Sequence, residues 1–113
     1  MISAETRMIY VACPYSHPDL AVRVDRFERV TRYTAKLYRQ GLIAFSPITH
    51  SHPLVEHGAP TDWESWRAFN RQISSVCDRF YILMLPAWDE SVGIKGEIEI
   101  FADRGIAPEY VRE

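Results

Sequence analysis

The sequence predicts an α/β fold in which a short parallel sheet is covered by helices on both faces. Short apolar segments alternate along the chain with longer segments whose apolar residues recur at helical spacing. The short segments, residues 8–12, 42–45 and 80–85, are apolar at consecutive positions rather than at alternate ones. Consecutive apolar residues are typical of strands that are covered on both faces, as parallel strands are.

The first strand is expected at residues 8–12, and Pro14 follows it because proline cannot continue a central ladder. The first helix is expected to begin with Ser16 as its cap and Asp19 three residues later, as in a capping box. Gly41 ends this helix in the usual C-terminal manner. The residues that recur at helical spacing between these ends are Leu20, Val24, Phe27, Val30, Thr34 and Leu37.

The second strand, residues 42–45, is closed by Pro47, and residues 48–60 show no periodicity. We expect residues 48–60 to form a long loop, and long loops in small domains are often functional. A capping box from Thr61 to Glu64 then predicts a second helix of about four turns. Its periodic residues are Trp63, Trp66, Phe69, Ile73 and Val76.

The third strand, residues 80–85, is the most apolar segment and is expected to be central in the sheet. Pro86 ends it, and residues 89–91 offer caps for a last helix that ends at Gly105. Residues 106–111 are a candidate fourth strand. The length of 113 residues fits a single domain of residues 1–113.

Glu97 is the sharpest local clue to function. On a helical wheel it falls inside the apolar stripe that Ile94 and Phe101 mark. A carboxylate on a buried face is costly unless it is paired or used. Gly93 and Gly96, early in the same helix, let a ligand approach the backbone, where free N–H groups favour an anion. The alternative is that Glu97 lies at the edge of the stripe and reaches water or an arginine.

Ligands of open parallel sheets bind outside the carboxyl ends of the strands. Trp88 follows the third strand and is the candidate for stacking a base, whereas Trp63 and Trp66 are expected to pack the second helix onto the sheet. Asp89 and Glu90, which follow the same strand, are candidate catalytic acids, with simple solvation as the alternative. The candidate binding residues at the strand ends are Pro14, Tyr15, Ser46, His50 and Trp88.

The histidines of residues 48–60 do not form a metal site in this interpretation, because no cysteine or acid completes a recognisable ligand spacing. His50 or His52 instead contacts a phosphate or a base, or is simply a loop histidine. The sequence has no glycine pattern of a dinucleotide-binding fold or a phosphate-binding loop. We therefore expect neither a metal nor a cofactor.

Charge and hydropathy limit the partners and the compartment. The net charge is −2 and no basic block occurs, which argues against a nucleic-acid polymer. The segment from Met1 to Arg7 lacks an apolar signal core, and no apolar run approaches the roughly 20 residues that cross a bilayer. Cys13 and Cys77 show no CxxC spacing. We expect a cytoplasmic protein that does not bind membranes.

Two segments carry a resemblance to a known superfamily. Residues 80–88 and the pattern of Ser91, Gly93 and Glu97, in the order Ser-x-Gly-x-x-x-Glu, resemble the nucleoside 2-deoxyribosyltransferase superfamily. The chain is more similar still to small uncharacterised bacterial and phage relatives of the DUF1937 and DUF4406 types. Those relatives also show a strand ending like residues 9–15 and a segment like residues 45–47.

The resemblance implies a flavodoxin-like three-layer α/β/α sandwich with a parallel sheet of four or five strands. It also implies that Glu97 attacks C1′ of a sugar, and that water or a second base resolves the glycosyl-enzyme. Tyr15 would reach the sugar or the nucleophile. Ser91 matches the branch that hydrolyses nucleoside 5′-monophosphates, where a serine contacts the phosphate, although capping the helix is the commoner use of such a serine.

Three functional hypotheses follow. The first is an N-glycosidase or deoxyribosyltransferase that acts on a nucleotide or nucleoside through Glu97, as a homodimer or a higher homo-oligomer. The second is a non-catalytic module that binds a nucleotide or a nucleotide sugar. The third is a structural protein that has lost the site. The sequence leaves open the base, the sugar, and the choice between hydrolysis and transfer.

Overall fold

All neighbouring strands of the sheet are parallel, in the order β2-β1-β3-β4, in a computed structural model that describes residues 7–113. This is the flavodoxin-like order up to its fourth strand. The predicted α/β sandwich with a short parallel sheet is therefore confirmed, and so is the interior position of β3. The strands are β1 Met8–Ala12, β2 Ile43–Phe45, β3 Arg79–Leu83 and β4 Glu109–Val111.

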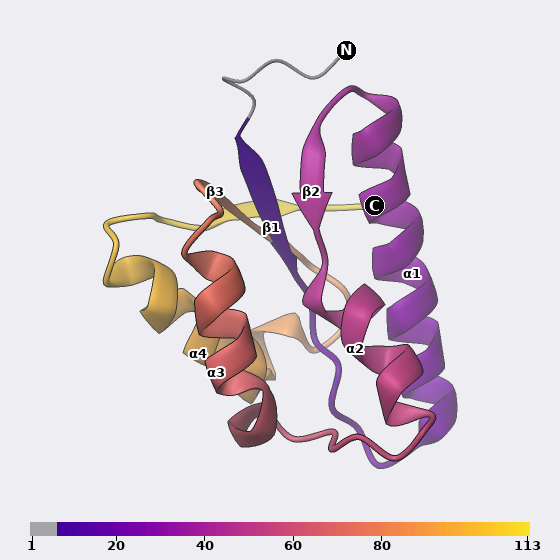
Figure 1. Cartoon of the computed structure of the whole chain (residues 1–113). Coiled ribbons are helices and arrows are strands. Elements are labelled where there is room, and N and C mark those ends of the chain that lie inside the picture. The colour runs from indigo at the N-terminus through magenta and orange to yellow at the C-terminus, as the bar shows by residue number, and fades with distance from the viewer. Residues whose placement is uncertain (1–6) are drawn as a thin grey trace.

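Helices cover both faces of the sheet (Figure 1). The helix α1 packs on one face, and α3 and α4 pack side by side on the other. The helix α2 lies against α1 beside β1. The helices of residues 7–113 are α1 Leu20–Arg39, α2 Pro47–Val55, α3 Trp63–Ser74 and α4 Val92–Ala102, with a short 3-10 turn η1 at Trp88–Glu90.

The strand β1 explains why the apolar runs are continuous. Ile9 and Val11 pack under α1, while Tyr10 and Ala12 point to the other face and pack under α4. The ring of Tyr10 lies edge-on to that of Phe101, with the centroids 5.1 Å apart. Both faces of the strand are dry, so every position from Ile9 onward is buried.

Two helix caps differ from the sequence prediction. Asp19, and not Ser16, caps α1, because the Asp19 carboxylate accepts a hydrogen bond from the backbone N–H of Ala21 at 2.9 Å. Asp62, and not Thr61, caps α3 in the same way. Each capping box contains an aspartate that accepts the capping bond, so the true cap lies further along the chain than the predicted one.

The predicted loop at residues 48–60 is wrong for most of its length, because Pro47–Val55 is the helix α2. Ser46 caps it by accepting a hydrogen bond from the N–H of Thr49 at 3.1 Å, and Pro47 occupies the favourable first position. Histidines and Pro53 are poor helix formers and hide the pattern. Packing against α1 stabilises the helix instead.

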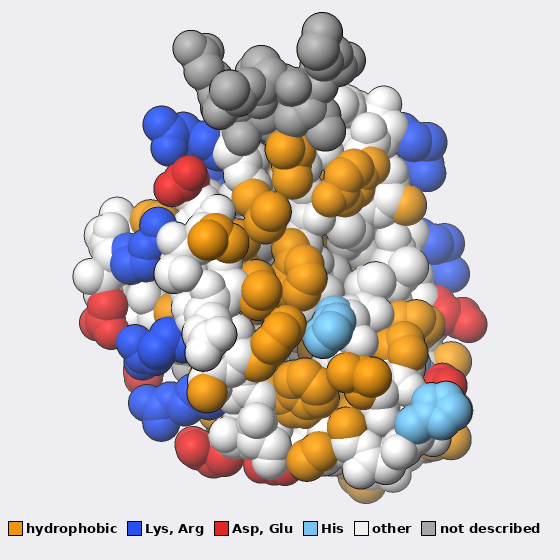
Figure 2. All heavy atoms as spheres, in the orientation of Figure 1, with side chains coloured by type: hydrophobic (Ala, Val, Ile, Leu, Met, Phe, Trp, Pro, Cys, Tyr) orange, Lys and Arg blue, Asp and Glu red, His pale blue; other side chains and the backbone are white. Residues whose placement is uncertain are grey.

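No helix within residues 7–113 is long and apolar enough to span a membrane. The expectation for the N-terminal segment concerns mainly residues 1–6, which lie outside the described residues. On the face shown in Figure 2, hydrophobic side chains gather between the α1–α2 side and the α3–α4 side of the molecule.

Candidate functional site

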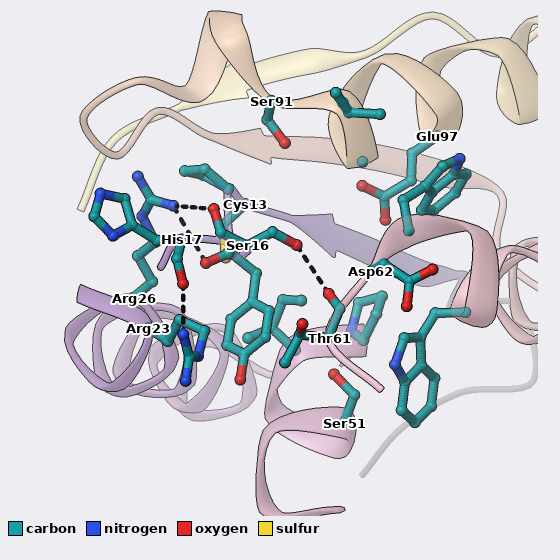
Figure 3. Close-up of a pocket in the computed structure, with 18 of the residues that line it drawn as sticks. Cys13, Ser16, His17, Arg23, Arg26, Ser51, Thr61, Asp62, Ser91 and Glu97 are labelled. Atoms are coloured by element: carbon teal, nitrogen blue, oxygen red, sulfur yellow. Dashed lines mark hydrogen bonds between the residues drawn. The ribbon is translucent and has the colours of Figure 1, made fainter. Parts of the chain in front are cut away.

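A cavity of about 880 Å³ lies at the carboxyl ends of the strands. Its walls come from the loop after β1, the first turns of α1, α2 and α3, and the first turns of α4 (Figure 3). This is the place that the parallel-sheet rule predicts. The fold therefore brings together segments that are up to about 80 residues apart in the sequence.

Glu97 lies in the wall of this cavity and is only 5% exposed. Its neighbours Ile94 and Phe101 are also buried, which confirms the predicted stripe. The phenol of Tyr10, a fully buried residue of β1, donates a short hydrogen bond to Oε2 of Glu97. No cation within residues 7–113 forms an ion pair with this carboxyl, so the alternative in which it reaches an arginine is wrong.

Burial determines the protonation of this pair. Loss of solvation raises the pKa of Glu97 from its ordinary value of 4.5 to about 8, although the hydrogen bond from Tyr10 acts in the opposite direction. Burial and the nearby carboxyl raise the pKa of Tyr10 as well, so this phenol remains a donor. Glu97 therefore keeps its proton at neutral pH more often than it loses it.

Tyr15 lines the cavity, but its hydroxyl is engaged elsewhere. It lies 2.6 Å from Nδ1 of His52, a buried residue of α2. The other ring nitrogen of His52 lies 2.9 Å from Glu56, without the alignment of a hydrogen bond. The phenol that touches Glu97 is Tyr10, which sequence reasoning missed. The alternation of β1 places Tyr10 on the α4 face, and this signal was available in the sequence.

Ser91, Gly93 and Pro14 all line the cavity. Ser91 caps α4, since its Oγ accepts a hydrogen bond from the N–H of Ile94 at 3.2 Å. The first turn of α4 therefore borders the cavity, and the partial positive charge of its N-terminus favours an anion there.

Trp88 and Asp89 do not line the cavity. Ala87, which precedes them, adopts a left-handed backbone with φ of 68° and starts the turn η1. The ring of Trp88 then packs against Tyr110 of β4, with the centroids 5.3 Å apart. Asp89 is exposed. The turn after β3 thus takes both side chains away from Glu97.

Ser46 and His50 also lie outside the cavity lining. Ser46 is buried as the cap of α2. His50 is exposed and stacks on Phe69 of α3, with the ring centroids 4.9 Å apart. The helix α2 causes this difference from the sequence prediction. Successive residues of a helix point in different directions around its axis, so Ser46 and His50 do not both face the strand ends.

Two arginines of α1 line the cavity and were missed by sequence reasoning, which placed them away from the apolar stripe. Arg23, Arg26 and His17 gather on one side of the close-up, opposite Glu97 and Asp62 (Figure 3). Nη1 of Arg26 donates hydrogen bonds to the backbone carbonyl oxygens of Tyr15 and Ser16, at 3.2 Å each. The cavity therefore has a cationic side.

Comparison with known proteins identifies the family. The model described as "Domain of unknown function (DUF1937)" matches residues 7–110. The chain belongs to the DUF1937 family. No curated protein matches the chain. The DUF1937 part of the resemblance is confirmed, whereas the wider link to the nucleoside 2-deoxyribosyltransferases stays a prediction.

The tryptophans of the DUF1937 domain differ from their expected role. Trp63 and Trp66 line the cavity, where sequence reasoning expected them to pack α3 onto the sheet. Trp63 lies over Gly96 of α4 so closely that a Cβ at Gly96 would be 2.3 Å from its ring. The space beside Gly96 is therefore occupied by the Trp63 ring, whereas the sequence analysis expected a ligand to approach the backbone there. Asn70, also of α3, is buried and lines the same wall.

Within residues 7–113 no group of three or more histidine, cysteine, aspartate or glutamate side chains is arranged to hold a metal ion. The chemistry available in the cavity of the DUF1937 domain is therefore that of one buried carboxyl, its phenol donor, a cationic side and aromatic walls.

The raised pKa of Glu97 predicts a pH-dependent stability. The folded protein keeps a proton that the unfolded chain releases, so the free energy of unfolding falls as the pH rises from about 4.5 to about 8. Glu97→Gln removes this loss. Its stabilisation relative to the wild type should be small at pH 5 and reach at most about 5 kcal/mol above pH 8. Urea denaturation at both pH values measures the difference.

The matched control is Glu99→Gln, which removes an exposed carboxyl from the same helix. Its effect should be near zero at both pH values. An effect of Glu97→Gln that does not change with pH would contradict the assigned protonation.

Proposed function

We propose that this DUF1937 domain cleaves the N-glycosidic bond of a nucleotide or nucleoside, with Glu97 as the nucleophile. The observation that carries the proposal is the Glu97 carboxyl itself, which is buried in a cavity wall without a cationic partner among residues 7–113. Such a carboxyl destabilises the fold when ionised. Carboxyls with strongly shifted pKa values cluster at functional sites for this reason.

The reaction has two displacement steps. An oxygen of the Glu97 carboxylate attacks C1′, the C1′–N bond breaks, and the base leaves with the bonding electrons and takes up a proton. Water, which gives up a proton, or a second base then attacks C1′ and breaks the ester bond to Glu97. Water yields the free sugar, a second base yields a new nucleoside or nucleotide, and either step regenerates the carboxylate. The hydroxyl of Tyr10 holds the other carboxylate oxygen and orients the nucleophile.

The raised pKa of Glu97 suits this reaction. Positive charge develops at C1′ as the base departs, and this charge lies next to the carboxylate. A poorly solvated carboxylate gains more from that charge than a hydrated one would, because the interaction is not screened by water. The stabilisation is therefore larger in the transition state than in the empty site.

The cationic side of the cavity favours a 5′-monophosphate over a free nucleoside. Arg23, Arg26 and the N-terminus of α4 with Ser91 all border the cavity. A guanidinium has five N–H donors, and the bonds of Arg26 to the backbone use only Nη1. The Nε of Arg23 is buried and has no hydrogen-bond partner among residues 7–113. These donors support binding of a phosphate.

The aromatic walls support the base. Trp63 and Trp66 provide flat apolar surfaces in the same cavity. The cavity volume of about 880 Å³ is within the range of small-molecule sites. A nucleotide combines an aromatic base with an anionic phosphate, which is the combination that this cavity offers.

The proposal also carries the expected setting of the protein, the cytoplasm, and the expected assembly, a homodimer or higher homo-oligomer. Cys13 and Cys77 are free and buried, which supports a reducing compartment. The oligomer is expected from the resemblance to the deoxyribosyltransferase superfamily. A non-catalytic nucleotide-binding module is the second candidate, because the same cavity would bind a nucleotide without turning it over.

Base release tests the proposal. The purified protein is incubated with a panel of nucleosides and 5′-monophosphates, and free base is followed by chromatography. Glu97→Gln should lower turnover by about a thousandfold or more, because the nucleophile is lost. Glu99→Gln, the exposed control on the same helix, should keep full activity. No release from any compound, together with a thermal shift on nucleotide addition, would favour the binding module.

The pH profile separates a nucleophile from a general acid. A nucleophilic Glu97 must be ionised, so kcat/KM should rise with pH and level off above about 8. If Glu97 were instead the acid that protonates the leaving base, kcat/KM would fall through the same pH range. The Tyr10 phenol does not ionise in this range, since burial raises its pKa.

Substitution of Arg26 tests the substrate class. Arg26→Gln should lower kcat/KM for the preferred monophosphate by about tenfold or more, because a charge-assisted contact is lost. The corresponding nucleoside should be affected much less. Arg32→Gln, an exposed arginine of the same helix, is the control. Equal losses for nucleotide and nucleoside would indicate that Arg26 only holds the loop after β1.

A further inference from the structure

A second hollow adjoins the main cavity and shares part of its lining. It has a volume of about 470 Å³ and opens between α3 and α4. Trp63, Glu64 and Val92 border both this outer groove and the main cavity. Of these three residues, Val92 is 69% exposed and Glu64 is exposed, so Trp63 is the only large, mostly covered side chain that the two hollows share.

The outer groove is rich in charged side chains. Its ionisable residues come from both helices and include cations and anions. They are Glu64, Arg67, Arg71, Lys95, Glu99 and Asp103. Trp63 lines both hollows, whereas Glu97 lines only the main cavity, so the indole forms part of the boundary between the outer groove and the cavity that contains Glu97.

Gly96 makes this position of the indole possible. A Cβ built at Gly96 would lie 2.3 Å from Cζ2 and 2.4 Å from Cε2 of Trp63, which no real side chain tolerates. At Gly93, one turn earlier, the Trp63 ring is at an ordinary contact distance of 3.8 Å. The ring therefore packs on α4 over Gly93 and Gly96, and Gly93 is a neighbour of Glu97 one turn further along the helix.

We propose that Trp63 is a positioning residue for Glu97: its indole is a partition that keeps water of the outer groove away from the carboxyl. Gly96, which has no side chain, leaves the space that the indole occupies. The shielding of Glu97 by Trp63 does not depend on the proposed N-glycosidase function, but its effect on catalysis does. A residue that keeps the carboxyl dry acts through Glu97 and does not touch the reacting atoms.

Tyr10 from β1 contacts the same carboxyl. The other titratable or charged groups that line the main cavity are Cys13, Tyr15 and His17 from the loop after β1, Arg23 and Arg26 from α1, Asp62 and Glu64 from the start of α3, and Glu90 from η1. Of these, only Tyr10 acts on the pKa of Glu97 besides burial itself. Substitution of Trp63 therefore changes the Glu97 pKa through the burial of the carboxyl, and not through its hydrogen bond to Tyr10.

The test is a titration of Glu97 in the protein without substrate. Carboxyl carbon shifts of ¹³C-labelled glutamate are followed against pH by NMR, and the Glu97 signal is assigned by its loss in Glu97→Gln. The wild type should titrate near pH 8. Trp63→Ala should lower this pKa by about one unit or more, toward the ordinary value, because water reaches the carboxyl. Trp63→Phe should lower it less.

Trp66→Ala is the matched control, because Trp66 lies on the same helix and lines the same cavity but does not border the outer groove. It should leave the Glu97 pKa unchanged. If Trp63→Ala does not fold, Gly96→Ala decides with Trp63→Phe. The new Cβ at position 96 displaces the indole, while alanine strengthens the helix. An unchanged Glu97 pKa in the folded variants overturns the proposal.

The outcome is separable from that of the proposed function. A lowered pKa in a protein that releases no base from any nucleotide would uphold the partition and refute the enzyme. Base release by the wild type, together with an unchanged Glu97 pKa in the Trp63 variants, would uphold the enzyme and refute the partition. If both hold, the rise of kcat/KM with pH should move to lower pH in Trp63→Ala by the same amount as the NMR titration.

Discussion

The buried hydrogen bond between Tyr10 and Glu97 is the interaction on which the site depends. It joins the central strand β1 to α4 through two side chains that are both almost completely covered. A carboxyl in such a position is tolerated because the phenol gives it a partner and because it can hold its own proton. The same constraint leaves the Glu97 carboxyl poorly solvated beside a cavity large enough for a small molecule.

The two faces of the sheet around this pair differ: one is a packed core, and the other adjoins the cavity. The face under α1 is packed with aliphatic and aromatic side chains, whereas the α4 face contains the carboxyl at the end of its core. Parallel strands end at one edge, so the loop after β1 and the starts of α2 and α4 meet there. The cavity is a consequence of that topology, and Trp63 on Gly96 closes its outer side.

Much of this could be predicted from sequence, because periodicity reports which faces are dry. The strands, α1, α3, α4 and the burial of Glu97 all followed from it. The helix α2 did not, since its prolines and histidines have no helical preference and only packing on α1 stabilises it. The positions of Trp88 and His50 depended on η1 and on α2, whose local turns no periodic pattern specifies.

The sequence by itself determined the class of fold and the presence of one carboxyl on a dry helical face, because both are properties of short-range spacing. Only the tertiary structure decided which phenol meets that carboxyl, that arginines of α1 line the cavity, and that Trp63 takes the place left by Gly96. Each of these contacts joins residues that are more than 30 positions from their partners or from α4. Such contacts arise from how the layers pack. The alternation of β1 indicates which face Tyr10 occupies, but not which side chain it meets there.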